Sequence, residues 1–358
     1  MYHLGRASYS YDKQPVWLPV GTAPYWRRLA RELLWMGMVS SRALDDLREV
    51  LQPLIDGEAG DYDALLKLIG DARLALLGVA SYGTHELFRA RAELTKRLIQ
   101  DLGFTSVAIA ADPAEVRRVD DFVRDRSADG LACASLADFT RFPTWLWRNA
   151  EMLDFVGWLR NFNDQFPRDI HKVGIYGLDV TVEPIDGPLW NAREQQLADS
   201  VDALMVRLAE MGRPPRTVVW EHSHHVGDAR ATDTIACSLG QLVRERHGRS
   251  AALVSFSTFS GSILVAREWN SAPRRQQLQP ALPESFEALC HAVVVPRFYV
   301  PLHQTPDRLS HVLRQPQLER VLGVVDKDAE YVRARLADQF DAFVFFDETR
   351  SLEPLITT

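Results

Sequence analysis

The stretch Arg73–Phe104, RLALLGVASYGTHELFRARAELTKRLIQDLGF, decides the fold class of this chain. Its first part, Arg73–Ala80, is a continuous apolar run, which is typical of a strand covered on both faces of a parallel sheet. Thr84 is a good N-cap, and the apolar spacing near 3.6 that follows predicts a helix over Thr84–Leu102. A strand followed at once by a helix is the unit from which doubly covered sheets are built.

The same alternation continues along the chain. The other predicted strands are Phe104–Ala111, Lys172–Leu178, Thr217–Glu221, Ala251–Phe256, Ala292–Val295 and Ala342–Phe346. The other predicted helices are Pro143–Asn163, Asn191–Met211 and Asp228–His247. The sequence therefore predicts an α/β fold with a largely parallel β-sheet flanked by helices, and it directs the search for a site to the carboxyl ends of the strands.

One main domain is expected over residues 41–358, because no internal repeat or linker interrupts the sequence. Residues 1–40 form an appendage with a proline-punctuated start and an amphipathic stretch, Tyr25–Met38. We expect this appendage to pack on the main body, with a contact between two copies as the alternative. The chain is accordingly expected to be a monomer or a homodimer.

Composition narrows the classes of partner. The 358 residues carry 41 Lys and Arg against 48 Asp and Glu, a net charge of −7, and are 46% hydrophobic. Without a basic run, this balance argues against nucleic acids and anionic membranes, and it favours a small hydrophobic metabolite. No apolar run is long enough to span a membrane and no signal peptide is recognisable, so a cytoplasmic location is expected. Three widely spaced cysteines, Cys133, Cys237 and Cys290, predict small buried apolar residues.

Several polar side chains follow the first strand. Ser81 is one residue out of register with the G-x-S-x-G motif, which disfavours a serine hydrolase. Arg91 interrupts the apolar face of the predicted helix, where its charge needs an acceptor, and a structural salt bridge and a ligand contact both stay open. His85 and Arg89 lie one helical turn apart near the same strand end, and Glu86 suits the helix N-terminus.

The segment after the Thr217–Glu221 strand is the richest in chemistry. Three of the ten histidines, His222, His224 and His225, follow Glu221 directly. Imidazoles at a strand end can serve as acid, base or ligand. In an extended chain His222 and His224 point one way and His225 the other, so a metal site is disfavoured.

Carboxylates also follow two other strands. Asp179 and Glu183 come after the Lys172–Leu178 run and are expected near the same edge of the sheet. Asp112 precedes Pro113, a pair that predicts a helix cap rather than a catalyst.

Six long segments occur in an order that one known family shares. They are GVASYGTHELFRARAELTKRLIQDLGF, RFPTWLWRNAEMLDFVGWLRNFN, VGIYGLD, VVWEHSHHVGDARATD, LGQLVRER and QFDAFVFFDETRSLEPL, between about Leu44 and Leu355. They resemble the erythromycin esterase family. The resemblance implies an α/β fold with a helical cover over the strand ends, and metal-independent hydrolysis of ester or lactone bonds by a histidine that activates water. The cover is expected to be reduced here, because the chain lacks much of the family's insertion between Asp179 and Trp190.

The resemblance also implies a changed active site. The family's first motif reads Gly-Glu-Ala-Ser-His-Gly, but Val79 stands at the glutamate position and Tyr82 at the position of the general-base histidine. The glutamate of the second motif is replaced by Ala110. A tyrosine, with a pKa near 10, is a poor base at neutral pH, so water activation by the family's route is expected to fail.

Other family positions are kept. Arg91 matches the family's active-site arginine, and His222 and His225 match a later His-Asn-x-His pair. The candidate catalytic residues are His222, His225, Tyr82, Arg91 and Glu221. The candidate substrate-binding residues are Ser81, His85, Glu86, Arg89, Asp179, Glu183, His224, Val79 and Ala110.

Three functions are compatible with this pattern. The first is an esterase-like enzyme repurposed for non-hydrolytic acid–base chemistry, such as cyclisation, elimination or isomerisation, on a hydrophobic polyketide-like metabolite. The second is an ester or lactone hydrolase that uses a different histidine base. The third is a catalytically silent protein that binds or sequesters a small molecule or antibiotic. No glycine-rich phosphate or dinucleotide loop occurs, so no cofactor is expected.

Overall fold

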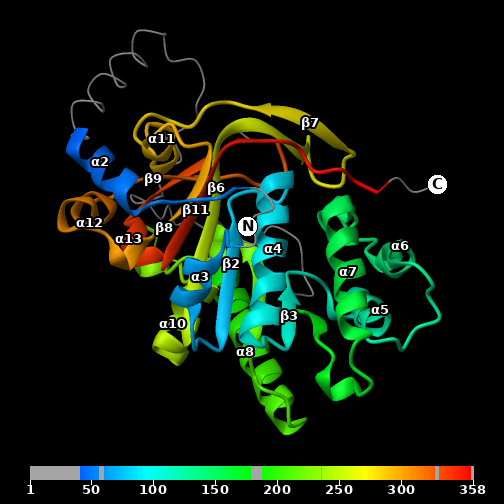
Figure 1. The fold of residues 1–358 in the computed structure, drawn as a ribbon. Helices are drawn as coiled ribbons and strands as arrows, with labels where there is room; N and C mark the ends of the chain where they lie inside the picture. The colour runs from blue at the N-terminus through cyan, green and yellow to red at the C-terminus, as the bar shows by residue number, and fades with distance from the viewer. Residues whose placement is uncertain (1–40, 56–59, 179–187, 235, 327–329, 356–358) are drawn as a thin grey trace, which may run out of the picture.

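The computed structural model describes residues 41–55, 60–178, 188–234, 236–326 and 330–355 (Figure 1). The strands are β1 Gln52–Pro53, β2 Leu74–Val79, β3 Ser106–Ile109, β4 Gly174–Gly177, β5 Thr217–His222, β6 Ala251–Ala266, β7 Pro273–Leu278, β8 Arg297–Pro301, β9 Gln317–Val321, β10 Glu330–Ala334 and β11 Ala342–Thr349. The α-helices are α2 Ser41–Val50, α3 Asp63–Ile69, α4 His85–Leu102, α5 Pro113–Val123, α6 Ala132–Ser135, α7 Ala150–Asn163, α8 Pro188–Glu210, α9 Ser223–Val226, α10 Leu239–His247, α11 Phe286–His291, α12 Asp307–Leu313 and α13 Leu336–Gln339.

The main sheet places its most apolar strands at its centre. Its strand order is β1-β8-β11-β6-β2-β5-β3-β4, with β7 paired to β6, while β9 and β10 form a separate pair. β2 runs parallel to both β5 and β6, and every residue of β2 and β5 is buried. Because both faces of these strands are covered, β2 is a continuous apolar run and β5 is apolar from Val218 to Trp220. The prediction of a largely parallel sheet flanked by helices is confirmed.

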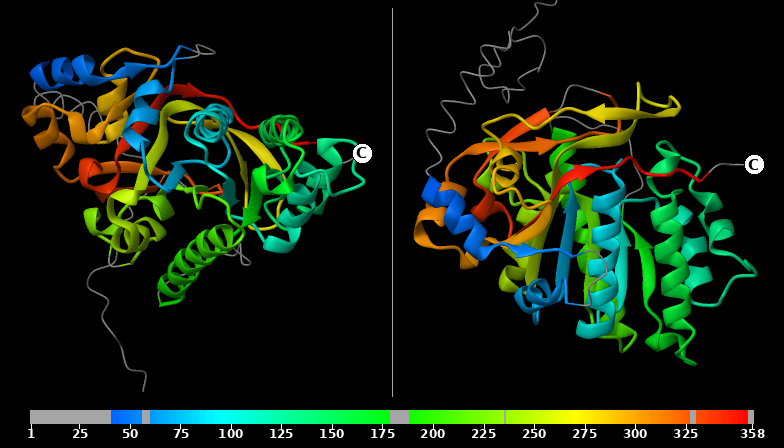
Figure 2. Two further views of the ribbon diagram at one scale, coloured as in Figure 1. Left: turned by 60° about the horizontal axis from the view of Figure 1, so that its bottom comes forward. Right: turned by 45° about the horizontal axis from the view of Figure 1, so that its top comes forward.

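Two hydrophobic clusters cover the two faces of this sheet. On one face, α4, α5 and α7 bury residues such as Phe88, Val119 and Phe155. On the other face, α8 and α10 bury residues such as Val201 and Val243. The left view of Figure 2 shows α4 and α7 on one side of the sheet and α8 and α10 on the other. None of the helices in the described ranges combines the length and apolar character needed to cross a membrane.

One predicted strand is wrong. Ala292–Val295 does not lie in a strand, and the strand of this region, β8, begins at Arg297. The backbone N–H groups of Ala292, Val293 and Val294 donate back to carbonyls of α11, so they are not free to join a sheet. Val294 has a φ of 61° and is 85% exposed, as expected of a turn after a helix and not of a buried strand.

Other element boundaries also differ from the prediction. β6 was expected to end at Phe256, but it continues to Ala266 because its second half pairs antiparallel with β7. The helix expected from Pro143 begins only at Ala150, where the Asn149 side chain caps it. The last predicted helix likewise begins at α10, after the cap residue Ser238. In each case a capping side chain or a distant strand sets the boundary.

Two further expectations can be compared with the structure. Cys290 is buried as expected, but Cys133 is exposed and Cys237 is half-buried, so the expectation of buried cysteines is wrong for these two. Cys133 lies on the short helix α6, where no core surrounds it. The appendage over residues 1–40 lies outside the described residues.

The short helix α9 fits between two glycines. A Cβ atom on Gly78 of β2 would lie 2.7 Å from Ser223 Cα, and one on Gly240 of α10 would lie 1.8 Å from the carbonyl oxygen of Val226. Real Cβ atoms do not approach other atoms this closely, so only glycine allows β2 and α10 to contact α9 at these distances. The turn that carries His224 and His225 is therefore held on both sides by backbone.

Gly240→Ala should destabilise the protein, because the new methyl group would overlap the Val226 carbonyl, which is backbone and has little freedom to move. Overpacking of this kind costs about 1–3 kcal/mol of the free energy of unfolding, measurable by urea denaturation. Gly157→Ala in α7 is the matched control, since its methyl group meets no described atom within 4 Å. The control should be neutral or slightly stabilising because alanine is the better helix former, and equal losses in both variants would contradict the close contact at Gly240.

Candidate active site

The carboxyl ends of β2 and β5 bring together several of the predicted site residues. The Tyr82 hydroxyl donates a hydrogen bond to Glu221 Oε2 at 2.9 Å, and the same oxygen accepts from the His222 N–H at 3.0 Å. Burial and the negative charge of Glu221 raise the pKa of Tyr82 well above its ordinary value of 10.0. Tyr82 is therefore a protonated hydrogen-bond donor, and Glu221 is its acceptor.

Arg91 lies in an aromatic cage beneath this pair. Its guanidinium carbon lies 4.6 Å from the ring centre of Trp220 and 4.8 Å from that of Phe88, and the side chain is fully buried. Nη1 donates to the Glu221 carbonyl at 3.5 Å, whereas Nε and Nη2 have no hydrogen-bond acceptor among the described residues. Burial lowers the pKa of Arg91 to about 10, and the nearby Tyr82 and Glu221 oppose this shift. The structure thus gives Arg91 cation–π contacts in place of a salt bridge to a described carboxylate.

The expectation that His222, His224 and His225 lie in an extended chain is wrong. β5 ends at His222, and the next four residues form the helical turn α9. His222 uses both of its ring nitrogens. Nε2 lies 3.0 Å from the Ala80 carbonyl and 3.2 Å from the Leu322 carbonyl, and Nδ1 accepts from the His224 N–H at 3.3 Å. This pattern requires the neutral ring with its proton on Nε2. Burial, followed by His225 and His224, lowers the pKa of His222 to about 3.

His225 has a different environment from its two neighbours. Its Nδ1 lies 2.7 Å from Glu194 Oε1 on α8, and Glu194 is fully buried with its second oxygen accepting from the Leu239 N–H at 2.7 Å. The ring stacks on Trp190 at 4.8 Å and 10°. Burial alone would lower the pKa of His225, but Glu194, and more weakly Glu221, outweigh burial and raise it. Nε2 makes no hydrogen bond to any residue that the structure describes.

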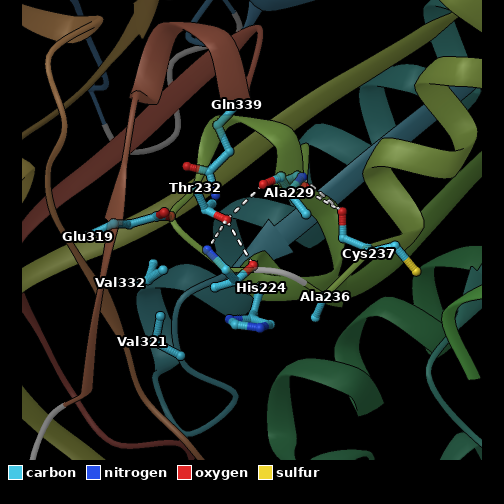
Figure 3. A pocket seen from close by; sticks show the side chains of 12 residues that line it. His224, Ala229, Thr232, Ala236, Cys237, Glu319, Val321, Val332 and Gln339 are labelled. Atoms are coloured by element: carbon cyan, nitrogen blue, oxygen red, sulfur yellow. Dashed lines mark hydrogen bonds between the residues drawn. The ribbon is translucent and has the colours of Figure 1, made fainter. Parts of the chain in front are cut away.

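His224 points to a third place. Its ring meets Trp190 edge-on at 5.2 Å, and it borders a small pocket with Cys237 on another side (Figure 3). Burial lowers the pKa of His224 to about 4, so its ring is neutral near pH 7. The three imidazoles do not converge, and no group of three His, Cys, Asp or Glu side chains in the described ranges could hold a metal ion.

Three predicted binding residues on the first turns of α4 are engaged elsewhere. His85 Nδ1 lies 2.5 Å from Glu151 Oε1, and Glu86 accepts from the Arg350 side chain at 2.9 Å and from its N–H at 2.6 Å. Arg89 is exposed. These side chains brace α4 against α7 and the C-terminal strand, or face solvent.

The small residues at the strand ends line the same region without adding charge. Val79 is 1% exposed and packs in the core on the α4 face, and Ser81 Oγ accepts from the Gly83 N–H at 3.0 Å. The Ala110 carbonyl accepts from Trp147 Nε1 at 3.1 Å. Asp179 and Glu183, the remaining two candidates, lie outside the described residues.

Comparison with known proteins identifies the family. The family model described as erythromycin esterase matches residues 99–186 and 181–349. The chain belongs to the erythromycin esterase family. The expected membership is confirmed.

Individual relatives of this family member are distant. An erythromycin esterase type II from Escherichia coli is 29% identical over 120 residues, and this match covers 34% of the chain but only 27% of that relative's length. Among solved structures, one described as a succinoglycan biosynthesis protein has a TM-score of 0.74 at 15% identity, covering 88% of this chain and 99% of its own. A mutant of the erythromycin esterase EreC in its open conformation has a TM-score of 0.54 at 13% identity, covering 84% and 96%. At such identities these structures establish the shared fold.

The sequence analysis missed Glu194, the partner of His225 in this esterase-family chain. A signal for it exists, because Glu194 shares one helical face with Leu197, Ala198 and Val201, all of which are buried. A carboxylate on the apolar stripe of a helix needs a buried partner, just as Arg91 does on α4. The pattern indicates such a partner without saying that it is a histidine 31 positions away.

The three-way contact of His222 leads to a pH prediction. The unfolded chain protonates His222 below its ordinary pKa of 6.5, but the folded protein does so only near its lowered pKa of about 3. The free energy of unfolding should therefore fall as the pH decreases from 6.5, and His222 alone contributes up to about 1.4 kcal/mol per pH unit. His222→Gln keeps a donor for the Ala80 or Leu322 carbonyl but removes this titration, so its stability should fall less steeply between pH 6.5 and 4.5.

Urea denaturation across this pH range measures the effect. His224, with its pKa lowered to about 4, contributes in the same direction in both proteins and so leaves the difference intact. His171→Gln, at an exposed histidine, is the matched control. Equal slopes for the wild type and His222→Gln would contradict the locked neutral ring.

Proposed function

We propose that this erythromycin-esterase-family protein is an enzyme that acts on a small hydrophobic metabolite by acid–base catalysis. His225 transfers the proton in a non-hydrolytic reaction such as cyclisation, elimination or isomerisation. The observation that carries the proposal is the contact between His225 Nδ1 and Glu194 Oε1 at 2.7 Å. A carboxylate on one ring nitrogen fixes the tautomer and leaves the other nitrogen to accept or donate the transferred proton.

The environment of this pair supports the same role. Glu194 is fully buried, and stacking on Trp190 fixes the plane of the His225 ring. Glu194 and Glu221 raise the pKa of His225 against the effect of burial, which makes the ring a stronger base than an isolated buried imidazole. Restraint of this kind, from a carboxylate and a flat ring contact, is what proton transfer requires of a positioned imidazole.

The other candidates are less suited to moving a proton. His222 engages both ring nitrogens, and a pKa of about 3 keeps it neutral. Tyr82 keeps its proton, because its pKa is raised and its hydroxyl donates a hydrogen bond to Glu221. Arg91 is enclosed by aromatic rings, so it supplies positive charge near Glu221 and does not reach a substrate directly. We propose that these three residues position the strand ends.

A non-hydrolytic reaction is supported by what stands at the family's water-activating positions. Tyr82 replaces the base, and its raised pKa prevents it from accepting a proton near neutral pH. Val79 and Ala110 are buried apolar residues, so neither position supplies a carboxylate to orient a water molecule, and the nearby Glu221 accepts the Tyr82 hydroxyl. An apolar wall of this kind suits a hydrophobic substrate.

His225→Gln should lower turnover by about 10²- to 10⁴-fold while the protein stays folded, because it removes the proton-transferring ring. Glu194→Gln should lower turnover less, and it should shift the acidic limb of the pH–rate profile to lower pH, because loss of the carboxylate lowers the pKa of His225 toward or below its ordinary value. His247→Gln is the matched control, since His247 also pairs with a carboxylate, Asp202, at 2.6 Å but lies on α10 away from the strand ends.

The assay uses metabolite extracts of the producing cells together with a panel of macrolides, lactones and aryl esters, all in ¹⁸O-labelled water. A product that depends on His225 and carries no label supports the proposal. A His225-dependent product that carries solvent oxygen identifies a hydrolase and overturns it. Ligands that bind and are recovered with unchanged structure, by NMR spectroscopy as well as by mass, in every reaction identify a silent binding protein and also overturn it.

A further inference from the structure

A second buried carboxyl lies beside the His224 ring, in the pocket of Figure 3. Glu319 of β9 and Gln339 of α13 form part of its wall and extend their head groups toward Thr232. The pocket has a volume of about 20 Å³, which is room for one or two groups the size of a water molecule. Glu319, Gln339 and Thr232 take no part in the contacts of His225 with Glu194 and Trp190.

Two oxygen atoms on this wall lack donors. Glu319 is 2% exposed and Gln339 is 3% exposed, yet Glu319 Oε2 and Gln339 Oε1 accept no hydrogen bond from the described residues. Buried polar atoms in folded proteins nearly always have a partner, and each one without it costs about 1–3 kcal/mol. Two such acceptors on the wall of one pocket indicate a ligand that brings donors.

The charge of this ligand follows from the surroundings of Glu319. The adjacent Arg320 directs its guanidinium to the Phe259 and Gln279 carbonyls, and Glu287 adds a second buried carboxyl nearby. Burial, with a contribution from Glu287, raises the pKa of Glu319 to about 8, although a hydrogen bond from the Gln339 side chain opposes this shift. A cation in the pocket would supply the countercharge that the described residues do not provide.

We infer that this Glu319 pocket binds the primary ammonium group of a small amine. Such a group is about the size of a water molecule and carries three N–H donors, which suits two unpartnered oxygens in a space of about 20 Å³. Hard metal cations take six or more oxygen ligands, which these two oxygens do not provide. Val321 and Val332 line the same pocket and suit the carbon chain of the amine.

The pocket is open to a ligand from solution. Thr232, Thr234 and Cys237 line it and are only half-buried, so this side reaches the surface. Ammonium binding goes beyond the function proposed above and requires no proton transfer by His225. A binding measurement and a turnover measurement therefore fail independently of each other.

Isothermal titration calorimetry with ethylammonium chloride tests the inference on the intact wild-type protein. Ethylammonium is charged at pH 7 and pH 9, and its binding favours the ionised form of Glu319. Since the free carboxyl has a pKa of about 8, binding at pH 7 should release close to one proton, and the affinity should rise about tenfold from pH 7 to pH 9. His224, with its pKa lowered to about 4, and Cys237, with a pKa raised by burial above 9.0, should change little over this range.

Variants separate the pocket from its surroundings. Glu319→Gln should reduce the affinity for ethylammonium at least tenfold and abolish proton release. Glu287→Gln is the matched control, because Glu287 is also a fully buried carboxyl of this region but is not part of the pocket wall. The amide oxygen of the glutamine can still accept the hydrogen bond that the Ser257 hydroxyl donates to Glu287 Oε1. The control should still bind ethylammonium, at pH 7 with equal or slightly higher affinity, because loss of the Glu287 charge removes one cause of the raised pKa of Glu319.

Several results would overturn the inference. The first is that the protein binds potassium saturably and does not bind ethylammonium. The second is that it binds propane, the uncharged isostere, as tightly as ethylammonium. The third is that a folded Glu319→Gln protein binds ethylammonium as tightly as the wild type does. Absence of any saturable heat with the wild type at both pH 7 and pH 9 would overturn it without any variant.

Discussion

The close contact between α9 and two glycines is the constraint on which the site depends. Gly78 of β2 and Gly240 of α10 let the turn Ser223–Val226 lie directly against backbone on both sides. Because the chain turns at once after His222 and does not stay extended, the three imidazoles leave in different directions. Each then meets the surroundings of a different part of the fold: two backbone carbonyls, a surface pocket, and a carboxylate on α8.

These surroundings give chemically identical side chains different properties. Burial disfavours the charged form of all three rings and lowers the pKa values of His222 and His224, to neither of which a carboxylate of the described residues bonds. His225 is just as enclosed, but the negative charge of Glu194 reverses the direction of its shift. One carboxylate on a neighbouring helix thus separates a ring suited to proton transfer from two that stay neutral. The distinction depends on tertiary structure and not on the local sequence.

The sequence predicted what local patterns determine. β2 and β5 are buried along their whole length, and the apolar runs Leu74–Val79 and Val218–Trp220 identify buried parallel strands and the edge where polar side chains gather. The sequence prediction failed at Ala292–Val295, where hydrogen bonds of the backbone determine the structure. The N–H groups of this segment bond back to the preceding helix. The sequence prediction also did not identify the aromatic rings around Arg91, Phe88 on the same helix and Trp220 on β5. The pairing of His225 with Glu194 joins segments 31 positions apart, and periodicity can indicate that a buried charge needs a partner but cannot identify it.

Two buried carboxyls lie near the His224–His225 dipeptide, Glu194 beside His225 and Glu319 in the pocket that His224 borders. They differ in how their charge is compensated. Glu194 has an imidazole at 2.7 Å and a backbone donor on its other oxygen, so its charge is compensated within the fold. Glu319 is as deeply buried, but no cation bonds to it among the described residues, and its pKa is raised accordingly. A buried carboxyl without a countercharge takes up a proton unless a cation supplies that charge. Trp190 packs against both imidazoles and donates through Nε1 to the Cys237 carbonyl, so a single side chain borders both regions.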